Sequence, residues 1–178
     1  FTLFEDFLLT LTLRQDGTSR FSKDNRTGLF PGAALAWKVT DSSAGDPFGL
    51  KFRIGYGVTG QQGINDVDYY PYLPRYLGSF STAQYQFGNQ FYNTLRPQGY
   101  DANIKWEETA TYNLGMDYSL FDDRLYGSID YYIRKTTDLI NFVPVPAGTN
   151  LTNYLTTNVG DLENKGVELA INAVPVRK

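Results

Sequence analysis

The sequence predicts an all-β fold, an antiparallel up-and-down meander of about six long strands. Three observations support this prediction. Apolar and polar residues alternate along several segments, the connections between those segments are alternately long and short, and no helical periodicity competes with the strands. The alternation indicates a sheet with one apolar and one polar face.

The first three strands are predicted at residues 9–17, 30–39 and 50–59, because each segment alternates apolar with polar or small side chains. Pro31 lies near the start of the second strand, where the missing N–H removes the fewest ladder hydrogen bonds. The link between the second and third strands is short and rich in turn residues.

Residues 106–136 contain the clearest pattern, two long strands joined by a tight turn at Asp122-Asp123. A two-residue loop pairs Leu120 with Leu125, and a slip of one residue would set apolar faces against polar ones. The same register predicts six further pairs: Met116 with Ile129, Leu114 with Tyr131, Tyr112 with Ile133, Asp117 with Ser128, Asn113 with Tyr132, and Thr111 with Arg134. Each strand has about thirteen residues, or about 43 Å at roughly 3.3 Å per residue. A strand that crosses an outer membrane needs only about 9–11 residues.

A last strand is predicted at residues 167–174, where apolar residues again alternate with polar ones. The connections at about 16–28, 60–105 and 138–157 are long, and the connections between them are short. Outer-membrane barrels combine short periplasmic turns with long extracellular loops. We therefore expect a single segment, residues 1–178, of a transmembrane barrel wall, with the three long loops outside the cell.

In such a wall one face meets lipid and the other faces a wet lumen. Four hairpin residues are expected to face lipid: Leu114, Met116, Ile129 and Ile133. Four are expected to face the lumen: Asn113, Asp117, Asp130 and Arg134. Four aromatic residues on the outward faces could belong to the girdles at the membrane boundaries: Trp37, Tyr56, Tyr112 and Tyr131.

Composition excludes several functions. With 16 basic and 19 acidic residues and a formal net charge of −3, the chain has no basic run that would bind nucleic acid. It contains no Cys and no His, so we expect no disulfide, no thiolate or histidine catalysis, no metal site and no cofactor. The mean hydropathy of −0.36 suits a soluble protein and a membrane barrel equally.

Two motifs suggest chemistry but are better explained by structure. Residues 55–60 spell GxGxxG, yet a dinucleotide site needs a helix there, and the chain instead reaches Pro71 and Pro74. Glu107 and Glu108 are neighbours on a strand, so they point to opposite faces and cannot act together. Asp122-Asp123 is explained as turn chemistry. We expect that this chain is not an enzyme.

The best candidate for ligand binding is the connection 60–105, which is rich in aromatic residues between positions 69 and 92. Aromatic faces stack on sugar rings or peptide side chains, and tyrosine adds a hydroxyl group for hydrogen bonding. The same residues would also suit packing of the loop against itself or contact with a capping protein. The candidate binding residues are Tyr69, Tyr70, Tyr72, Arg75, Tyr76 and Tyr85, with Arg96 nearby.

Several motifs occur in an order that resembles one family along nearly the whole chain. They are LTLRQDGTSRF at 11–21, FPGAALAW at 30–37, LKFRIGYGVTG at 50–60, KWEET at 105–109 with NLG at 113–115, and NVG at 158–160 with NKGVEL at 164–169. This set resembles the SusC/RagA family of TonB-dependent outer-membrane transporters.

The resemblance implies a segment of a 22-stranded barrel that imports nutrients, typically oligosaccharides or peptides, across the bacterial outer membrane. It also implies partners: a SusD-like surface lipoprotein, the TonB complex and outer-membrane lipid. A plug domain and a TonB box have no counterpart in this sequence, so we expect a piece that cannot transport alone. Cut from its barrel, the sheet would have two unpaired edges, through which we expect it to self-associate.

The alternative reading is a soluble β-sandwich module that binds carbohydrate through the aromatic loop. Strand length separates the two readings, because a closed two-sheet sandwich favours strands of about five to seven residues.

Overall fold

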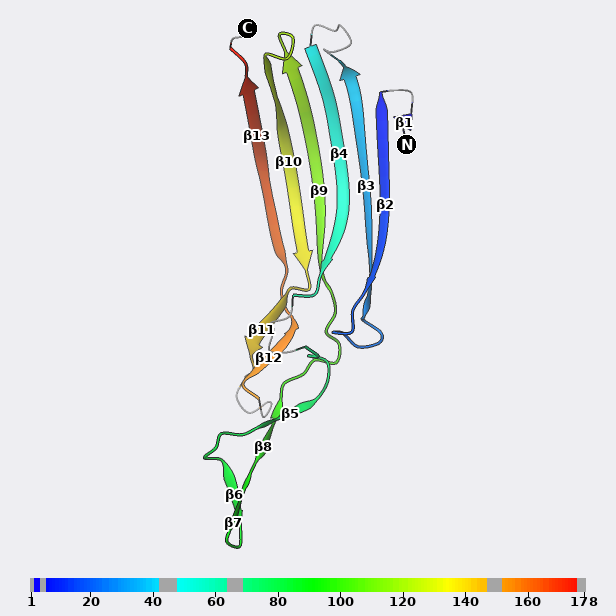
Figure 1. Cartoon of the computed structure of the whole chain (residues 1–178). Coiled ribbons are helices and arrows are strands. Elements are labelled where there is room, and N and C mark those ends of the chain that lie inside the picture. Colours follow the sequence, from blue (N-terminus) through cyan, green and yellow to red (C-terminus); the bar gives the residue numbers. More distant parts are fainter. Residues whose placement is uncertain (1, 4–5, 42–47, 64–68, 147–151, 176–178) are drawn as a thin grey trace.

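The structure, a computed structural model, describes residues 2–3, 6–41, 48–63, 69–146 and 152–175. Its main feature is one antiparallel sheet of long strands, with smaller hairpins extending from one end (Figure 1). The strands of this sheet are β1 (Thr2–Leu3), β2 (Phe7–Gly17), β3 (Thr27–Thr40), β4 (Phe48–Gln61), β9 (Glu107–Leu120), β10 (Leu125–Thr137) and β13 (Leu162–Ala173). They lie in the order β1-β2-β3-β4-β9-β10-β13, so each long strand pairs with the next long strand of the chain.

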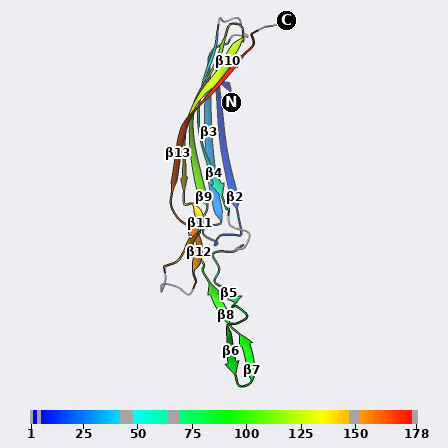
Figure 2. The same cartoon turned by 90° about the vertical axis from the view of Figure 1, so that its left-hand side faces the viewer.

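Six of these strands contain between 11 and 14 residues. Seen from its edge, the sheet is one thin, twisted layer (Figure 2). The all-β meander of about six long strands is therefore confirmed. A closed sandwich of short strands is not favoured, because the described residues contain one large layer rather than two packed sheets.

The central hairpin has the predicted register. Leu120 lies opposite Leu125, Met116 opposite Ile129, and the further predicted pairs are also found. The turn itself is longer than predicted. Residues 121–124 form a four-residue turn in which Phe121, Asp122 and Asp123 have φ values of 57°, 53° and 61°.

The physical reason for this difference is the backbone of Phe121. A residue with left-handed φ cannot continue an extended ladder, so Phe121 does not pair with Arg124 as a two-residue loop would require. The Arg124 N–H is shared between the carbonyls of Leu120 at 3.1 Å and Phe121 at 3.2 Å. The register is unchanged because the turn gains one residue on each side of the two aspartates, Phe121 before them and Arg124 after them.

The strand boundaries differ most at the end of the chain. The last strand begins at Leu162 and not at Val167, five residues earlier than predicted. Glu163, Asn164 and Lys165 follow Leu162 and interrupt the alternation that marked the strand. These polar residues enter the sheet because each pairs with a residue of β10, with Glu163 opposite Lys135.

Three two-stranded ribbons occur within the long connections, where the sequence pattern predicted none. They are formed by β5 (Arg75–Gly78) with β8 (Leu95–Gln98), β6 (Gln84–Phe87) with β7 (Gln90–Asn93), and β11 (Ile140–Pro144) with β12 (Tyr154–Asn158). The β6–β7 ribbon is the most distant element from the main sheet (Figure 1). We call the end of the sheet that carries these ribbons the loop end, and the opposite end the turn end.

The buried core also lies at the loop end. Its fully or nearly fully buried apolar residues, which we call the rim cluster, are Phe21, Phe30, Ile104 and Trp106. The edges of both phenylalanine rings meet the indole, with ring centroids 5.6 Å and 5.4 Å from that of Trp106. Most other large apolar residues of the sheet are exposed. In the described residues there is no helix long and apolar enough to cross a membrane.

Candidate functional site

One face of the sheet is a continuous apolar surface. The strand registers align a row of apolar residues straight across six strands: Leu9, Leu35, Ile54, Leu114, Tyr131 and Val167. Leu114 is 56% exposed and Val167 is 68% exposed, so nothing in the described chain covers this face. A patch of this extent on one face is unusual for a soluble monomer and indicates contact with an apolar surrounding.

The aromatic residues expected in the girdles lie on this same face. Tyr56 and Tyr112 are cross-strand partners with ring centroids 5.0 Å apart, and Trp37 lies between Phe7 and Phe52 at 5.7 Å and 6.2 Å. The hairpin residues Met116, Ile129 and Ile133 also share the face of Leu114. Because side chains alternate between the two faces along each strand, every residue that was expected to point outward lies on this one face.

The opposite face carries an ionic network. The Arg53 guanidinium donates two hydrogen bonds to Asp117, from Nε to Oδ2 at 2.9 Å and from Nη2 to Oδ1 at 2.7 Å, and its Nη2 lies 3.1 Å from Asp130. Lys51 is 3.1 Å from the same Asp117 carboxylate. These half-buried pairs tie β4, β9 and β10 together, and a glycine at 115 leaves the guanidinium room, since a Cβ there would lie 2.8 Å from Arg53 Cζ.

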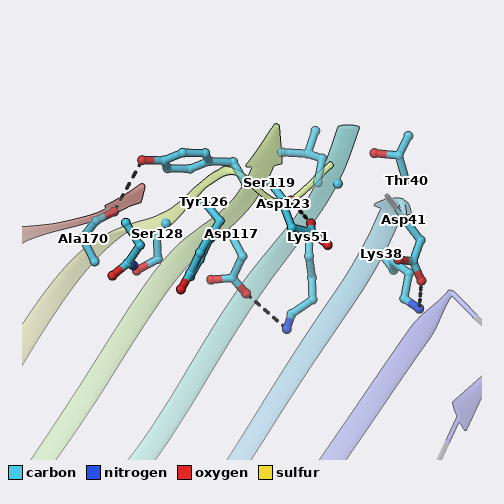
Figure 3. Close-up of a pocket in the computed structure, with 15 residues that line it drawn as sticks. Lys38, Thr40, Asp41, Lys51, Asp117, Ser119, Asp123, Tyr126, Ser128 and Ala170 are labelled. Atoms are coloured by element: carbon cyan, nitrogen blue, oxygen red, sulfur yellow. Dashed lines mark hydrogen bonds and ion pairs between the residues drawn. The ribbon is translucent and has the colours of Figure 1, made fainter. Parts of the chain in front are cut away.

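At the turn end, this polar face is hollowed, with a volume of about 630 Å³ (Figure 3). Figure 3 shows the lysines at the hollow meeting carboxylates of the wall, Lys51 with Asp117 and Lys38 with Asp41 at 2.9 Å. Ser119 is hydrogen-bonded to Asp123 beside them. Because the two lysines are paired with carboxylates, neither offers a free charge that would select a ligand at the hollow.

At the loop end, hydrogen bonds join three connections into a rim. The Trp106 indole N–H donates to the carbonyl of Arg26 at 3.2 Å, and the Asn25 amide donates to the carbonyl of Asn103 at 2.9 Å. These bonds attach the loop between β2 and β3 to the segment that leads into β9. The rim cluster is therefore supported by polar contacts at its edge.

A second set of hydrogen bonds attaches the β11–β12 ribbon to the same rim. The Asn158 amide donates to the carbonyls of Lys105 at 3.0 Å and Asp138 at 2.7 Å, and its oxygen accepts the Lys105 N–H at 2.9 Å. Thr157 donates to the Asp101 carboxylate at 2.5 Å. One asparagine side chain thus connects the connection 60–105 with the connection 138–157.

The structure places the six predicted binding residues in separate regions. Tyr70 and Tyr72 are in contact, edge to face with centroids 6.5 Å apart, and Tyr72 is half-buried against the rim cluster. Tyr69 is exposed beside them. This part of the loop therefore anchors it to the rim and presents two tyrosines to solvent.

The remaining three residues lie on the ribbons. Arg75 and Tyr76 are consecutive on β5 and so point to opposite faces of the β5–β8 ribbon. Tyr85 lies opposite Tyr92 on the distant β6–β7 ribbon (Figure 1). Of the six residues, only Tyr70 and Tyr72 form a ring contact with each other.

A groove with a volume of about 290 Å³ lies between the β5–β8 and β11–β12 ribbons. The sequence pattern did not predict it. We call it the rim groove. Its main lining residues are Leu77, Arg96, Gln98, Phe142, Tyr154 and Thr156. They come from connections more than forty residues apart, and only the pairing of two short ribbons brings them together. The available signal was two short β-prone segments, 140–144 and 154–158, separated by Pro, Gly and Asn.

No three Asp or Glu side chains in the described ranges gather where they could hold a metal ion. The polar side chains that line the rim groove are amides, hydroxyls and one guanidinium group. This donor set suits hydrogen bonding to a neutral polar ligand.

Comparison with known proteins agrees with this architecture. The family model described as "TonB dependent receptor-like, beta-barrel" matches residues 1–174. The chain is 46% identical over 180 residues to the TonB-dependent receptor SusC of Bacteroides thetaiotaomicron, covering 99% of this chain and 18% of that protein. It is 36% identical over 179 residues to the TonB-dependent receptor P39 of Formosa agariphila, covering 96% of this chain and 16% of that protein.

Among solved structures, the RagAB peptide importer in its closed-closed state matches with a TM-score of 0.78 at 21% sequence identity, covering 98% of this chain and 18% of that chain. This likeness shows the shared fold. The chain spans about 18% of the length of SusC. These matches confirm the SusC/RagA resemblance of the ordered motifs, and the chain belongs to the TonB-dependent receptor family, as a segment of its β-barrel.

Proposed function

We propose that this chain forms part of the wall of a nutrient importer in the bacterial outer membrane, driven by TonB. The observation that carries the proposal is the single-layer sheet, whose strands of 11 to 14 residues expose one continuous apolar face. Strands of that length exceed the about 9–11 residues needed to cross the membrane. The apolar face meets lipid, and the face with the Arg53 network meets the wet lumen.

This orientation assigns the two ends of the sheet. The short turns, such as residues 121–124, lie on the periplasmic side, and the connections 16–28, 60–105 and 138–157 lie outside the cell. The rim and its ribbons then stand at the extracellular mouth. A barrel of 22 strands, of which this chain supplies six long ones, remains the prediction for the complete protein.

The cargo is an oligosaccharide or a peptide, and the extracellular loops make the first contact with it. The candidate contact residues are Tyr69, Tyr70, Tyr72, Arg75, Tyr76 and Tyr85. Support for two of them comes from exposure, since Tyr76 and Tyr85 are 68% and 62% exposed and their rings are free to stack on a ligand. A SusD-like surface lipoprotein is the proposed partner at the same mouth.

The test is uptake by cells. The gene for the complete receptor is deleted and restored, and entry of fluorescently labelled oligosaccharides and peptides is measured with and without a functional TonB. We expect uptake of at least one cargo to require both the receptor and TonB. Uptake that continues in the absence of either component would overturn the proposal.

A further inference from the structure

We propose that the rim groove binds one sugar ring of an oligosaccharide, held between the aromatic face of the β11–β12 ribbon and the polar face of the β5–β8 ribbon. The proposal rests on the proposed function only for the class of cargo. The sugar contact then lies between two ribbons, and Arg96 is the one lining residue that the sequence pattern had also pointed to.

The two ribbons present facing surfaces because side chains alternate along each strand. On the β5–β8 ribbon, Leu77 lies opposite Arg96, and Gln98 follows two residues later on the same face. On the β11–β12 ribbon, Phe142 lies opposite Thr156, and Tyr154 shares that face. All six residues line the groove, so it is formed by one face of each ribbon.

The aromatic wall is a pair of stacked rings. The rings of Phe142 and Tyr154 have centroids 4.9 Å apart and are inclined by only 17°. They are 51% and 49% exposed, so a large part of each ring is open to a ligand. The outer ring face of this stacked pair matches the apolar C–H face of a sugar ring, which needs a flat apolar partner on one side and hydrogen-bonding groups at its edge.

Those hydrogen-bonding groups are provided by Gln98, Arg96, Asn153 and Thr156. The side-chain oxygen of Gln98 is buried and has no hydrogen-bond partner within the described residues. Such an unpaired acceptor is costly, and rotation of the Gln98 side chain into the groove would bring it within reach of a sugar hydroxyl. The lining contains no Asp or Glu, and its one charged group is Arg96, whose guanidinium lies 5.3 Å from the centroid of the Phe80 ring.

The separation of the two ribbons is set by Gly99 at the floor of the groove. A Cβ at this position would lie 2.6 Å from the carbonyl oxygen of Tyr154 and 2.9 Å from Thr152 Cγ2. Only glycine therefore permits this close approach. The resulting volume of about 290 Å³ is just below the roughly 300–1,000 Å³ found for ligand pockets, which suits a single ring better than a longer segment.

The experiment measures binding to the complete receptor in detergent by isothermal titration calorimetry. The probes are a panel of short linear oligosaccharides of glucose, galactose, mannose and xylose, with an equimolar mixture of short peptides as the comparison. For the sugar that binds best, Phe142→Leu combined with Tyr154→Leu should weaken binding at least about tenfold, since the apolar bulk remains but both ring faces are lost.

Gln98→Met separates an effect on sugar binding from an effect on stability. It removes the buried unpaired oxygen, so the free receptor should become no less stable, yet sugar binding should weaken about fivefold. Two controls lie outside the groove: Leu95→Ala on the outer face of β8, and Phe121→Ala in the turn at the other end of the sheet. Both residues are 68% exposed, and both variants should bind like the unaltered receptor.

Three results would overturn the proposal: no sugar of the panel binds, the groove variants bind as well as the controls, or peptides and not sugars depend on the groove. Binding in detergent does not need TonB, which separates this inference from the proposed function. Groove-dependent sugar binding without cellular uptake would support the inference and contradict the import function. Cellular uptake, together with sugar binding that the groove variants do not weaken, would support the import function and contradict the inference.

Discussion

Replacement of Leu114 by arginine tests which face of the sheet meets lipid. Leu114 is near the middle of β9, with seven strand residues before it and six after it. Six residues at about 3.3 Å each, tilted by roughly 45°, place it about 14 Å from the strand end along the membrane normal. That depth is close to the midplane of an apolar band about 25 Å tall.

The expected cost of Leu114→Arg is therefore about 2–4 kcal/mol, the range for arginine at the midplane of a barrel, or roughly 30- to 700-fold in the unfolding equilibrium. Leu114 is 56% exposed, so this cost arises from the surrounding lipid more than from lost packing within the protein. The matched control is Asn113→Arg, the adjacent residue on the opposite face. Its cross-strand neighbour Gly55 has nothing within 4 Å of the position of a Cβ, which leaves room for the longer side chain. We expect its cost to stay below about 0.5 kcal/mol.

The assay is guanidinium unfolding of the complete receptor refolded into phospholipid vesicles, followed by intrinsic fluorescence. The free energy of unfolding should fall for Leu114→Arg and remain nearly unchanged for Asn113→Arg. Equal effects of the two substitutions, or a larger effect of Asn113→Arg, would refute the assignment of the apolar face to lipid.

Three further predictions concern packing, the rim and the sheet edges. Gly127→Ala would set a Cβ against the backbone carbonyl of Ala170, which cannot swing away as a side chain can, and should lower the free energy of unfolding by about 1–3 kcal/mol. Gly55→Ala, with open space around it, should change thermal unfolding little. Trp106→Phe removes the indole donor to the Arg26 carbonyl and should cost about 1 kcal/mol, seen as faster protease cleavage of the loops at the rim than in the unaltered receptor. The excised segment should self-associate through the outer edges of its sheet, and light scattering that shows a monomer at high concentration without detergent would contradict this.

The strand alternation predicted the wall well because a barrel wall is repetitive. Met116 and Ile129 could be paired from the sequence, since a period of two and one tight turn leave a single register that matches apolar with apolar residues. The same rule did not locate the beginning of the last strand. There Glu163, Asn164 and Lys165 are polar in succession, and they belong to the sheet only because β10 supplies their partners.

The candidate binding residues were predicted only from the composition of the connection that contains them. The aromatic content of the connection 60–105 indicated contact with a ligand or a partner, but it could not show that Tyr85 lies on a ribbon distant from the main sheet, away from Tyr70 and Tyr72. Short ribbons of four or five residues have too few positions for alternation to be recognised. Their faces are defined by which strand pairs with which.

The sequence by itself determined the class of fold, the register of the central hairpin, the two faces of the wall and the family. Each of these depends on local order along the chain: alternation, turn residues and motifs in sequence. Only the tertiary structure decided where the long connections go. The rim cluster joins Phe21 to Trp106, and the rim groove joins Arg96 to Tyr154, across separations that carry no periodic signal. Contacts between distant segments depend on packing and on close approaches such as that at Gly99, and those arise only when the chain is folded.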